Sequence, residues 1–357
     1  MSDNDQIRPI FMPAGVAGPD KRAGYVSDTS GSIQALGLAE GELIWRSQFA
    51  ARPLIVKGNR LAALRRATPD RENALQVVVL DRNDQGKLLI ESDAIIFPDW
   101  VSATVLTNES FSYSVRVQGD DLLLEWEAQG RYRGGAPPPA FIQAQANKAA
   151  TGIVRVDLKT GKVRMVSAKS RSEIELPASL RESTLFSYQI GVSDTWETEP
   201  WVVDEEMAAA ITGEIAEEQQ ALQLQRWNPV TGKAQKPVAL VKGLALVSYV
   251  TPDGCHLFIH SEMPPDESSP EAKAPWWLFS VSTGKQLAVL EYEQGAREAC
   301  VLDSHLYYIV DDPPPALRSD GDILQSTIKA LDIVSGRTLW QHLLSSERSA
   351  LRPALRQ

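Results

Sequence analysis

Short runs of alternating apolar and polar residues make up most of the chain, and six of them are followed by a turn that contains glycine. The turn glycines are Gly41, Gly86, Gly161, Gly232, Gly284 and Gly336. A period of two is typical of half-buried β-strands, and glycine allows the positive φ that tight strand connections often need. Helical periodicity is confined to residues 205–221. The pattern predicts an all-β protein.

A second pattern repeats in phase with the glycine turns. Phe-Ser-Tyr occurs at residues 111–113 and 186–188, and Val-Ser-Tyr at residues 247–249. Each triplet begins a unit that reads as four strands, A to D, with the glycine turn joining C to D. In the fifth unit we expect strands at residues 244–250, 255–260, 276–281 and 286–291. Four-stranded repeats of about 40 to 50 residues are the mark of a β-propeller.

Six units are legible, so residues 1–357 are expected to form a single propeller domain of six blades. The units lie near residues 8–50, 51–95, 96–170, 171–241, 242–293 and 294–345. Seven blades is the alternative, because a further unit could be hidden in one of the two long intervals between turn glycines. The tail, residues 346–357, contains Ala-Leu-Arg-Pro, which echoes Ala-Ala-Arg-Pro at residues 50–53. We therefore expect the tail to supply a strand that closes the ring.

Residues 330–340 read Ala-Leu-Asp-Ile-Val-Ser-Gly-Arg-Thr-Leu-Trp. This segment resembles the docking repeat of pyrroloquinoline-quinone-like (PQQ-like) propellers, Ala-x-Asp-x-x-Thr-Gly-x-x-x-Trp, and residues 35–45 keep the alanine, glycine and tryptophan of that repeat. In such a motif the aspartate can accept backbone N–H groups of its turn, and the tryptophan buries a large face against the neighbouring blade. The resemblance thus implies a structural docking motif that contains Trp45, Asp332, Gly336 and Trp340.

Catalytic signatures are missing from the chain. Quinone-dependent members of the family carry a calcium clamp and often an adjacent cysteine pair, whereas Cys255 and Cys300 are not adjacent. His256 and His260, if they lie on one strand, are ~13 Å apart and cannot share a metal ion. A Gly-x-Ser-x-Gly elbow and phosphate-binding glycine loops do not occur. We therefore predict no catalytic, cofactor-binding or metal-binding residue; a quinone- or metal-dependent oxidoreductase, or another propeller enzyme with its site at the central channel, is the alternative.

Long insertions fall in one slot of their units, between strands B and C. They are residues 133–150, 204–220, 261–275 and 311–324. In a four-stranded blade these loops all emerge on one face, and insertions confined to one face are typical of a binding surface. Neutral growth of surface loops is the alternative. We predict a non-catalytic protein-interaction or ligand-recognition module with a candidate interaction face at Arg133, Trp196, Trp201, Glu205, Glu206, Asp311 and Asp312.

Charge narrows the choice of partner. The chain has 36 Lys+Arg against 46 Asp+Glu, a net charge of −10, which argues against a nucleic-acid-binding surface. Residues 194–218 contain nine carboxylates and no Lys or Arg. The partner we expect is an unidentified protein or small ligand, and this stretch suggests a basic one, although a solvated acidic face is the simpler explanation of the carboxylates alone.

Membrane and export signals are also missing from the sequence. There is no run of about 18 apolar residues, and the first residues are acidic rather than those of a secretory leader. We expect a cytoplasmic monomer without cofactor or membrane span. An exported scaffold of the outer-membrane-assembly type is a further alternative.

Overall fold

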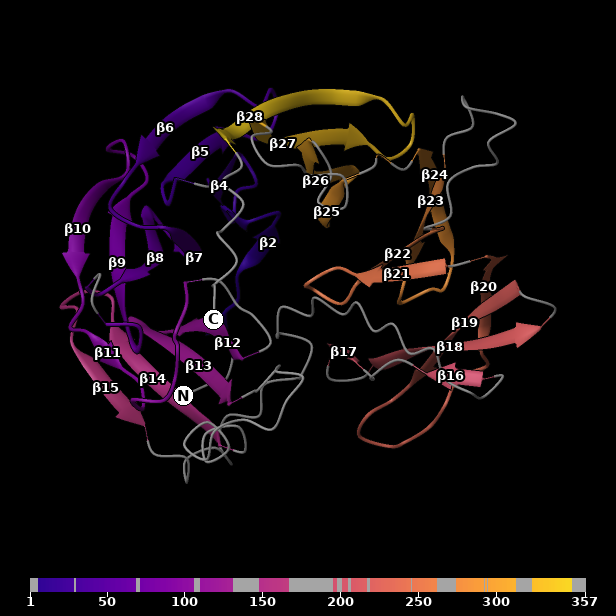
Figure 1. Cartoon of the computed structure of the whole chain (residues 1–357), viewed down its shortest axis with the longest axis horizontal. Coiled ribbons are helices and arrows are strands. Elements are labelled where there is room, and N and C mark those ends of the chain that lie inside the picture. Colours follow the sequence, from indigo (N-terminus) through magenta and orange to yellow (C-terminus); the bar gives the residue numbers. More distant parts are fainter. Residues whose placement is uncertain are drawn as a thin grey trace, which may run out of the picture. The chain divides into compact units, whose positions relative to one another are not determined.

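The computed structural model describes residues 6–28, 30–68, 71–105, 110–130, 148–166, 195–197, 201–204, 207–216, 219–244, 246–261, 274–291, 293, 295–312 and 323–348. Every regular element in these ranges is a β-strand, and the strands form six antiparallel sheets (Figure 1). This confirms the all-β class. The chain divides into two compact units, Met1–Glu175 and Leu176–Gln357.

The first unit contains three sheets. Sheet 1 consists of β2 (Ile10–Met12), β3 (Gly15–Ala17), β4 (Ala23–Ser27), β5 (Ile33–Gly37) and β6 (Leu43–Ser47). Sheet 2 consists of β7 (Arg52–Lys57), β8 (Arg60–Arg66), β9 (Ala74–Asp81), β10 (Lys87–Glu91) and β11 (Ile95–Ile96). Sheet 3 consists of β1 (Gln6–Ile7), β12 (Phe111–Gln118), β13 (Asp121–Gln129), β14 (Ala149–Asp157) and β15 (Val163–Val166).

The second unit contains the other three sheets. Sheet 4 consists of β16 (Thr195–Glu197), β17 (Trp201–Asp204), β18 (Met207–Ala216), β19 (Gln219–Trp227) and β20 (Val238–Gly243). Sheet 5 consists of β21 (Leu246–Val250), β22 (His256–Ser261), β23 (Pro275–Ser280) and β24 (Gln286–Glu291). Sheet 6 consists of β25 (Ala296–Leu302), β26 (His305–Asp312), β27 (Ile323–Asp332) and β28 (Thr338–Arg348).

The predicted glycine turns occur in all six sheets. Each of the six turn glycines has a φ between 68° and 75°. In sheet 6, Gly336 donates its N–H to the carbonyl of Asp332, whose carboxylate accepts both the N–H and the hydroxyl of Ser335 at 2.7 Å. This tight turn therefore depends on a residue without a Cβ and on a short acceptor side chain at its start. The four strands of sheet 5 lie within two residues of the positions predicted for the fifth unit.

Two sequence expectations are wrong in sheet 4. Most of residues 205–221, where the sequence has a helical periodicity, forms β18 and the start of β19, which pair from Ala208↔Trp227 to Ala216↔Gln219. Consequently residues 204–220 are not an insertion between strands B and C, because most of them form a strand of the sheet. Ala208, Ala209 and Ala210 are all buried. Small apolar side chains fit on both faces of an inner strand, and the alternation that reveals a half-buried strand is then lost.

The N-terminal strand adds a feature that the repeat pattern does not contain. In β1, Gln6 pairs with Gln118 and Ile7 with Val117, which gives sheet 3 its fifth strand. Most of the predicted closing tail, residues 349–357, lies outside the described residues.

Apolar cores join consecutive sheets within each unit. In the first unit, one core lies between sheets 1 and 2 and another between sheets 2 and 3, where Phe97 contacts Phe111 and Trp126 edge to face. In the second unit, one core lies between sheets 4 and 5 and another between sheets 5 and 6. Edge-to-face aromatic pairs strengthen such packing beyond the area that they bury.

Candidate functional site

The ends of the strands form two opposite rims on each sheet, and the two rims have different roles. We call these rims edges, and the word does not refer here to the outermost strands. We call the edge that carries the turn glycine the turn edge; in sheet 6 it contains Asp303 and Gly336. We call the opposite edge the loop edge; in sheet 6 it contains Asp312, at the end of β26, and Ala296, at the start of β25. The predicted interaction face corresponds to the loop edges.

Polar contacts between consecutive sheets concentrate at the turn edges. The indole N–H of Trp45 in sheet 1 donates to the carbonyl of Arg82 in sheet 2 at 3.1 Å. Arg60 of sheet 2 donates to the carbonyl of Leu158 in sheet 3 at 3.0 Å. Arg226 of sheet 4 donates to the carbonyl of Val281 in sheet 5 at 3.4 Å. The turn edges are thus engaged in holding neighbouring sheets together.

An ion-pair cluster adds to this cohesion. Lys57 of sheet 2 lies 3.0 Å from Asp120, which is in the first turn of sheet 3, and Lys159 also contacts Asp120. Hydrogen bonds from Lys159 and Lys57 lower the pKa of Asp120 to about 2. Because Asp120 is exposed, this cluster orients the turns more than it stabilises the fold.

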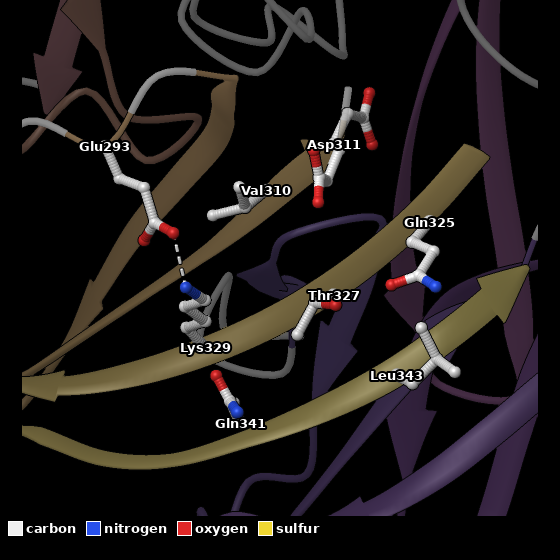
Figure 2. Close-up of a pocket in the computed structure, with 9 residues that line it drawn as sticks. Glu293, Val310, Asp311, Gln325, Thr327, Lys329, Gln341 and Leu343 are labelled. Atoms are coloured by element: carbon white, nitrogen blue, oxygen red, sulfur yellow. Dashed lines mark hydrogen bonds and ion pairs between the residues drawn. The ribbon is translucent and has the colours of Figure 1, made fainter. Parts of the chain in front are cut away.

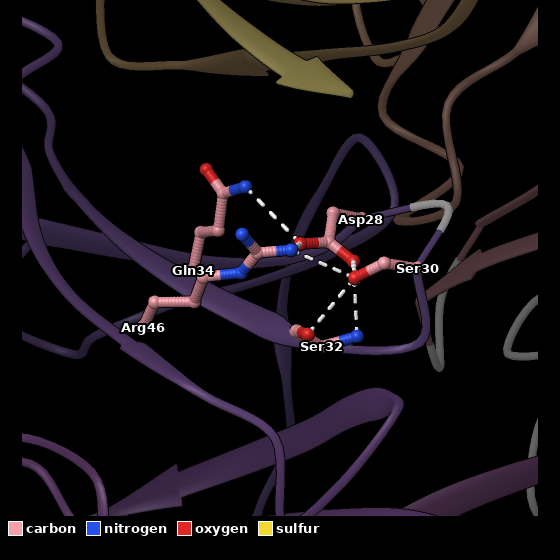
Figure 3. A network of polar contacts seen from close by, with 5 residues as sticks. All are labelled: Asp28, Ser30, Ser32, Gln34 and Arg46. Carbon is pink, nitrogen blue, oxygen red and sulfur yellow. Dashed lines mark hydrogen bonds and ion pairs between the residues drawn. The ribbon is translucent and has the colours of Figure 1, made fainter. Parts of the chain in front are cut away.

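The loop edge of sheet 1 holds a buried carboxylate (Figure 3). The side chain of Asp28 is fully buried and accepts hydrogen bonds from the Ser30 hydroxyl at 2.6 Å, the Ser32 N–H at 2.9 Å and the Gln34 amide at 3.2 Å. Arg46 forms an ion pair with it at 2.6 Å. Burial alone would raise the pKa of Asp28, but these hydrogen bonds and the Arg46 charge outweigh burial and lower it. All of its partners are in sheet 1, so the network orders the β4–β5 connection.

Sheet 6 changes character from its turn edge to its loop edge on the face that packs against sheet 5. At the turn edge, Leu306 and Leu331 pair across the strands and belong to the core with sheet 5. Further along the same face, Tyr308 pairs with Lys329, then Val310 with Thr327, and at the loop edge Asp312 pairs with Gln325. On β28, Gln341 pairs with Lys329 and Leu343 pairs with Thr327, so both extend these cross-strand rows. The face is therefore apolar at one edge and mainly polar at the other.

A groove of about 750 Å³ occupies the polar part of this face (Figure 2). Its lining consists of Glu293, Val310, Asp311, Asp312, Gln325, Thr327, Lys329, Gln341 and Leu343. We call it the sheet 6 groove. None of these nine described residues is aromatic.

Three charged groups of the groove already have partners. The ammonium of Lys329 contacts the Glu293 carboxylate, which also accepts the Tyr308 hydroxyl at 3.2 Å. Arg297, behind the lining, lies 2.9 Å from Asp311, and the Ser326 hydroxyl donates to Asp311 at 2.7 Å.

The pKa shifts around the groove follow from these contacts. Burial opposes the charge on Arg297, but the carboxylates of Glu298 and Asp311 outweigh burial and raise its pKa. Burial and the neighbouring Glu293 raise the pKa of Tyr308, so its hydroxyl keeps its proton.

Of the residues of the predicted interaction face, the structure places two in the lining of the groove. Asp312 is exposed and lines the groove, and Asp311 lines it with a buried carboxylate paired to Arg297. Arg133, Glu205 and Glu206 lie outside the described residues, and the backbone of Trp196 belongs to β16.

Trp201 requires a correction. We expected it to be exposed beside carboxylates, but it is 5 % exposed and lies in the core between sheets 4 and 5. Its indole N–H donates to the carbonyl of Gly254 in sheet 5 at 3.2 Å. β17 also pairs Asp204 with Met207, so residues 205–206 connect β17 to β18 rather than strands B and C. Trp201 therefore joins two sheets and is not available to a partner.

The residues of the resembled docking motif lie at the turn edges or near them. Trp45 contacts the turn of sheet 2. Trp340 is buried, pairs with Ala330 across β27 and β28, and its ring centroid lies 5.8 Å from that of Tyr307 in the same sheet. Asp332 and Gly336 form the turn described above.

Most of the groove lining was not identified from the sequence. Gln325, Thr327 and Lys329 form a polar series with a period of two inside a strand, which is a detectable signal. That signal alone reads as an ordinary solvated face, and Glu293 and Gln341 carry no signal of their own. Only the pairing of β26, β27 and β28 brings these residues together.

Within the described ranges, no three His, Cys, Asp or Glu side chains are grouped so that they could hold a metal ion. Among the same residues, no helix is long and apolar enough to cross a membrane.

Comparisons with known proteins give weak similarities. No family model matches the chain, and no curated protein matches it. Among solved structures, the AtxE2 isopeptidase aligns over 93% of this chain and 52% of its own, with 10% identity and a TM-score of 0.44. BamB from Moraxella catarrhalis aligns over 95% and 77% with 13% identity and a TM-score of 0.27, and the Dos1 propeller over 92% and 69% with 10% identity and a TM-score of 0.26. At these values the fold assignment depends on the sheets and the repeats themselves.

Proposed function

We propose that the chain is a non-catalytic β-propeller of six PQQ-like blades that works as a protein-interaction module through its loop edges. The fold part of the proposal is supported by six antiparallel sheets that consist of consecutive strands, apart from β1 in sheet 3, each with its glycine turn in the corresponding place. A single four-stranded unit cannot bury both of its faces. When such units stack around an axis, each unit buries its faces against its neighbours.

The position of the sheet 6 groove supports the functional part of the proposal. The turn edges are engaged in bonds between sheets, as Trp45, Arg60 and Arg226 illustrate. The sheet 6 groove opens at a loop edge, where polar side chains replace the apolar core. A surface that is concave and rich in hydrogen-bonding groups is suited to recognition.

Site-specific photo-cross-linking tests the assignment of the edge. A photoreactive amino acid is placed at Gln325, which is exposed at the loop edge of sheet 6, or at Ser304, which is exposed at its turn edge. Irradiation in living cells should yield a discrete cross-linked product from position 325 and none from position 304. Products from position 304 alone would overturn the proposal.

A further inference from the structure

The charge balance of the sheet 6 groove points to a cationic ligand. Among the described residues, its lining carries three carboxylates and one ammonium group. Glu293 is paired with Lys329, and Asp311 with Arg297. Asp312 is exposed at the loop edge and takes part in neither pair. The remaining negative charge attracts a cation and repels a carboxylate or phosphate group.

The apolar part of the lining suits the stem of a long cationic side chain. Val310 and Leu343 both flank Thr327 in one cross-strand row, and Leu343 is 50% exposed. This row adjoins the row that contains Asp312. Lysine and arginine bury their methylene groups on apolar surface while the charged end reaches a polar partner. Val310 is buried, so Leu343 supplies most of this apolar surface, and a stem over Leu343 would lie in the groove that Asp312 also lines.

The remaining lining suits an extended backbone. Gln325, Thr327 and Gln341 offer both donors and acceptors, which match the N–H and C=O groups of a peptide. From Lys329 to Gln325 the strand advances four residues, or ~13 Å, which is the length of about four residues of extended peptide. None of the described lining residues is aromatic, so these residues offer no platform on which a base or sugar ring could stack.

We propose that the sheet 6 groove binds an extended peptide segment of a partner protein through a lysine or arginine side chain directed at Asp312. The inference rests on the proposed interaction function and names the chemistry of the partner. Lys329 does not oppose such a ligand, since Glu293 neutralises it.

Binding of defined peptides tests the proposal. The probe is a fluorescein-labelled peptide Ser-Lys-Ser-Lys-Ser, its Glu-containing counterpart is the ligand control, and affinity is measured by fluorescence anisotropy. Asp312→Asn should weaken binding of the lysine peptide by about two- to fivefold, the range of an exposed ion pair. Asp312→Lys should weaken it by about tenfold or more, because it places like charges together. The Glu peptide should not bind the wild-type protein.

Asp303→Asn is the matched control for Asp312→Asn. It removes the same charge from the same sheet but at the turn edge, and asparagine tolerates the φ of 56° at this position. Asp303→Asn should leave the affinity unchanged. Gln341→Lys provides a second groove variant should Asp312→Lys fail to fold, and thermal unfolding establishes that each variant is native.

Three results would overturn the inference: no binding of the lysine peptide, equal binding of the Glu peptide, or equal weakening by Asp312→Asn and Asp303→Asn. The last would mean that the overall charge of the protein attracts the peptide. The photo-cross-link at position 325 distinguishes this failure from that of the proposed function. If position 325 cross-links to a partner but the lysine peptide does not bind, the loop edge remains an interaction surface and only the proposal of a cationic ligand is overturned.

Discussion

The indole of Trp45 in sheet 1 lies against the backbone of Gly86 in sheet 2. A Cβ atom on Gly86 would come within 2.7 Å of the Trp45 ring, which is closer than real Cβ contacts allow. The Trp45 N–H bonds to the carbonyl of Arg82 in the same turn, and the Ser47 hydroxyl donates to the carbonyl of Gly86 at 3.1 Å. The glycine thus serves both the shape of its own turn and the docking of the preceding sheet.

Replacement of this glycine should separate the two roles. In Gly86→Ala the methyl group meets the Trp45 ring and also has to adopt a φ of 70°. Gly336→Ala imposes a similar φ of 68°, but open space surrounds its Cβ position. We expect Gly336→Ala to lower the free energy of unfolding by about 1–2 kcal/mol, and Gly86→Ala by a further ~1–3 kcal/mol. Urea unfolding followed by circular dichroism measures both, and equal losses would contradict the docking role.

Substitution of Trp201 should lower the stability of the fold and leave the affinity for the peptide unchanged. Trp201→Ala removes a buried ring and its hydrogen bond to Gly254, so it should lower the free energy of unfolding by about 3–5 kcal/mol. Trp201→Phe keeps most of the apolar volume and should cost less, about 1–2 kcal/mol. The affinity of the natively folded Trp201→Phe protein for the lysine peptide should equal that of the wild type. If Trp201→Phe lowers the affinity for the lysine peptide without lowering the free energy of unfolding, Trp201 belongs to the interaction face after all.

Asp28 should make the protein sensitive to acid. Its pKa in the folded state is lower than the ordinary value of 3.8, so the charged form stabilises the fold above that value. This contribution is lost as the pH falls through the lower pKa of the folded state. Asp28→Asn should cost about 1–3 kcal/mol at pH 7, a range that allows for the solvent exposure of Arg46, and should flatten the decline of stability below pH ~4.

The control for this acid effect is Asp84→Asn, which removes a carboxylate that is 61 % exposed. It should leave both the stability at pH 7 and its acid dependence close to those of the wild type. Thermal midpoints between pH 2 and pH 7 supply the comparison. An acid profile of Asp28→Asn that parallels the wild type would argue against the proposed charge network.

The two thiols should differ in reactivity. Cys300 is buried, and burial together with the nearby Asp253 raises its pKa well above the ordinary value. Cys255 is partly exposed in the β21–β22 turn. Because the thiolate is the reactive form, a disulfide reagent at pH 8 should label about one thiol per native chain and both thiols in urea. Equal labelling rates in the native protein would contradict the burial of Cys300, and Cys255→Ser identifies which thiol reacts.

The local features of the fold could be read from the sequence. The positive φ of Gly284 and the four strands around it depend on residues within a few positions of one another, so period and turn chemistry were sufficient. The same reasoning was wrong for residues 205–221, because the consecutive buried alanines of β18 do not alternate. It also placed Trp201 at the surface on the evidence of its acidic neighbours in the sequence.

The sequence by itself determined the class of the protein and the places where each sheet turns, because these follow from contacts between near neighbours in the chain. Only the tertiary structure decided which side chains meet across sheets. Trp201 finds its acceptor 53 residues away, and Lys329 meets Glu293 across 36 residues. The burial of the first and the position of the second in a groove depend on how strands pair and sheets pack. No periodicity along the chain records that arrangement, since the period of a strand shows which residues share a face and not what packs against that face.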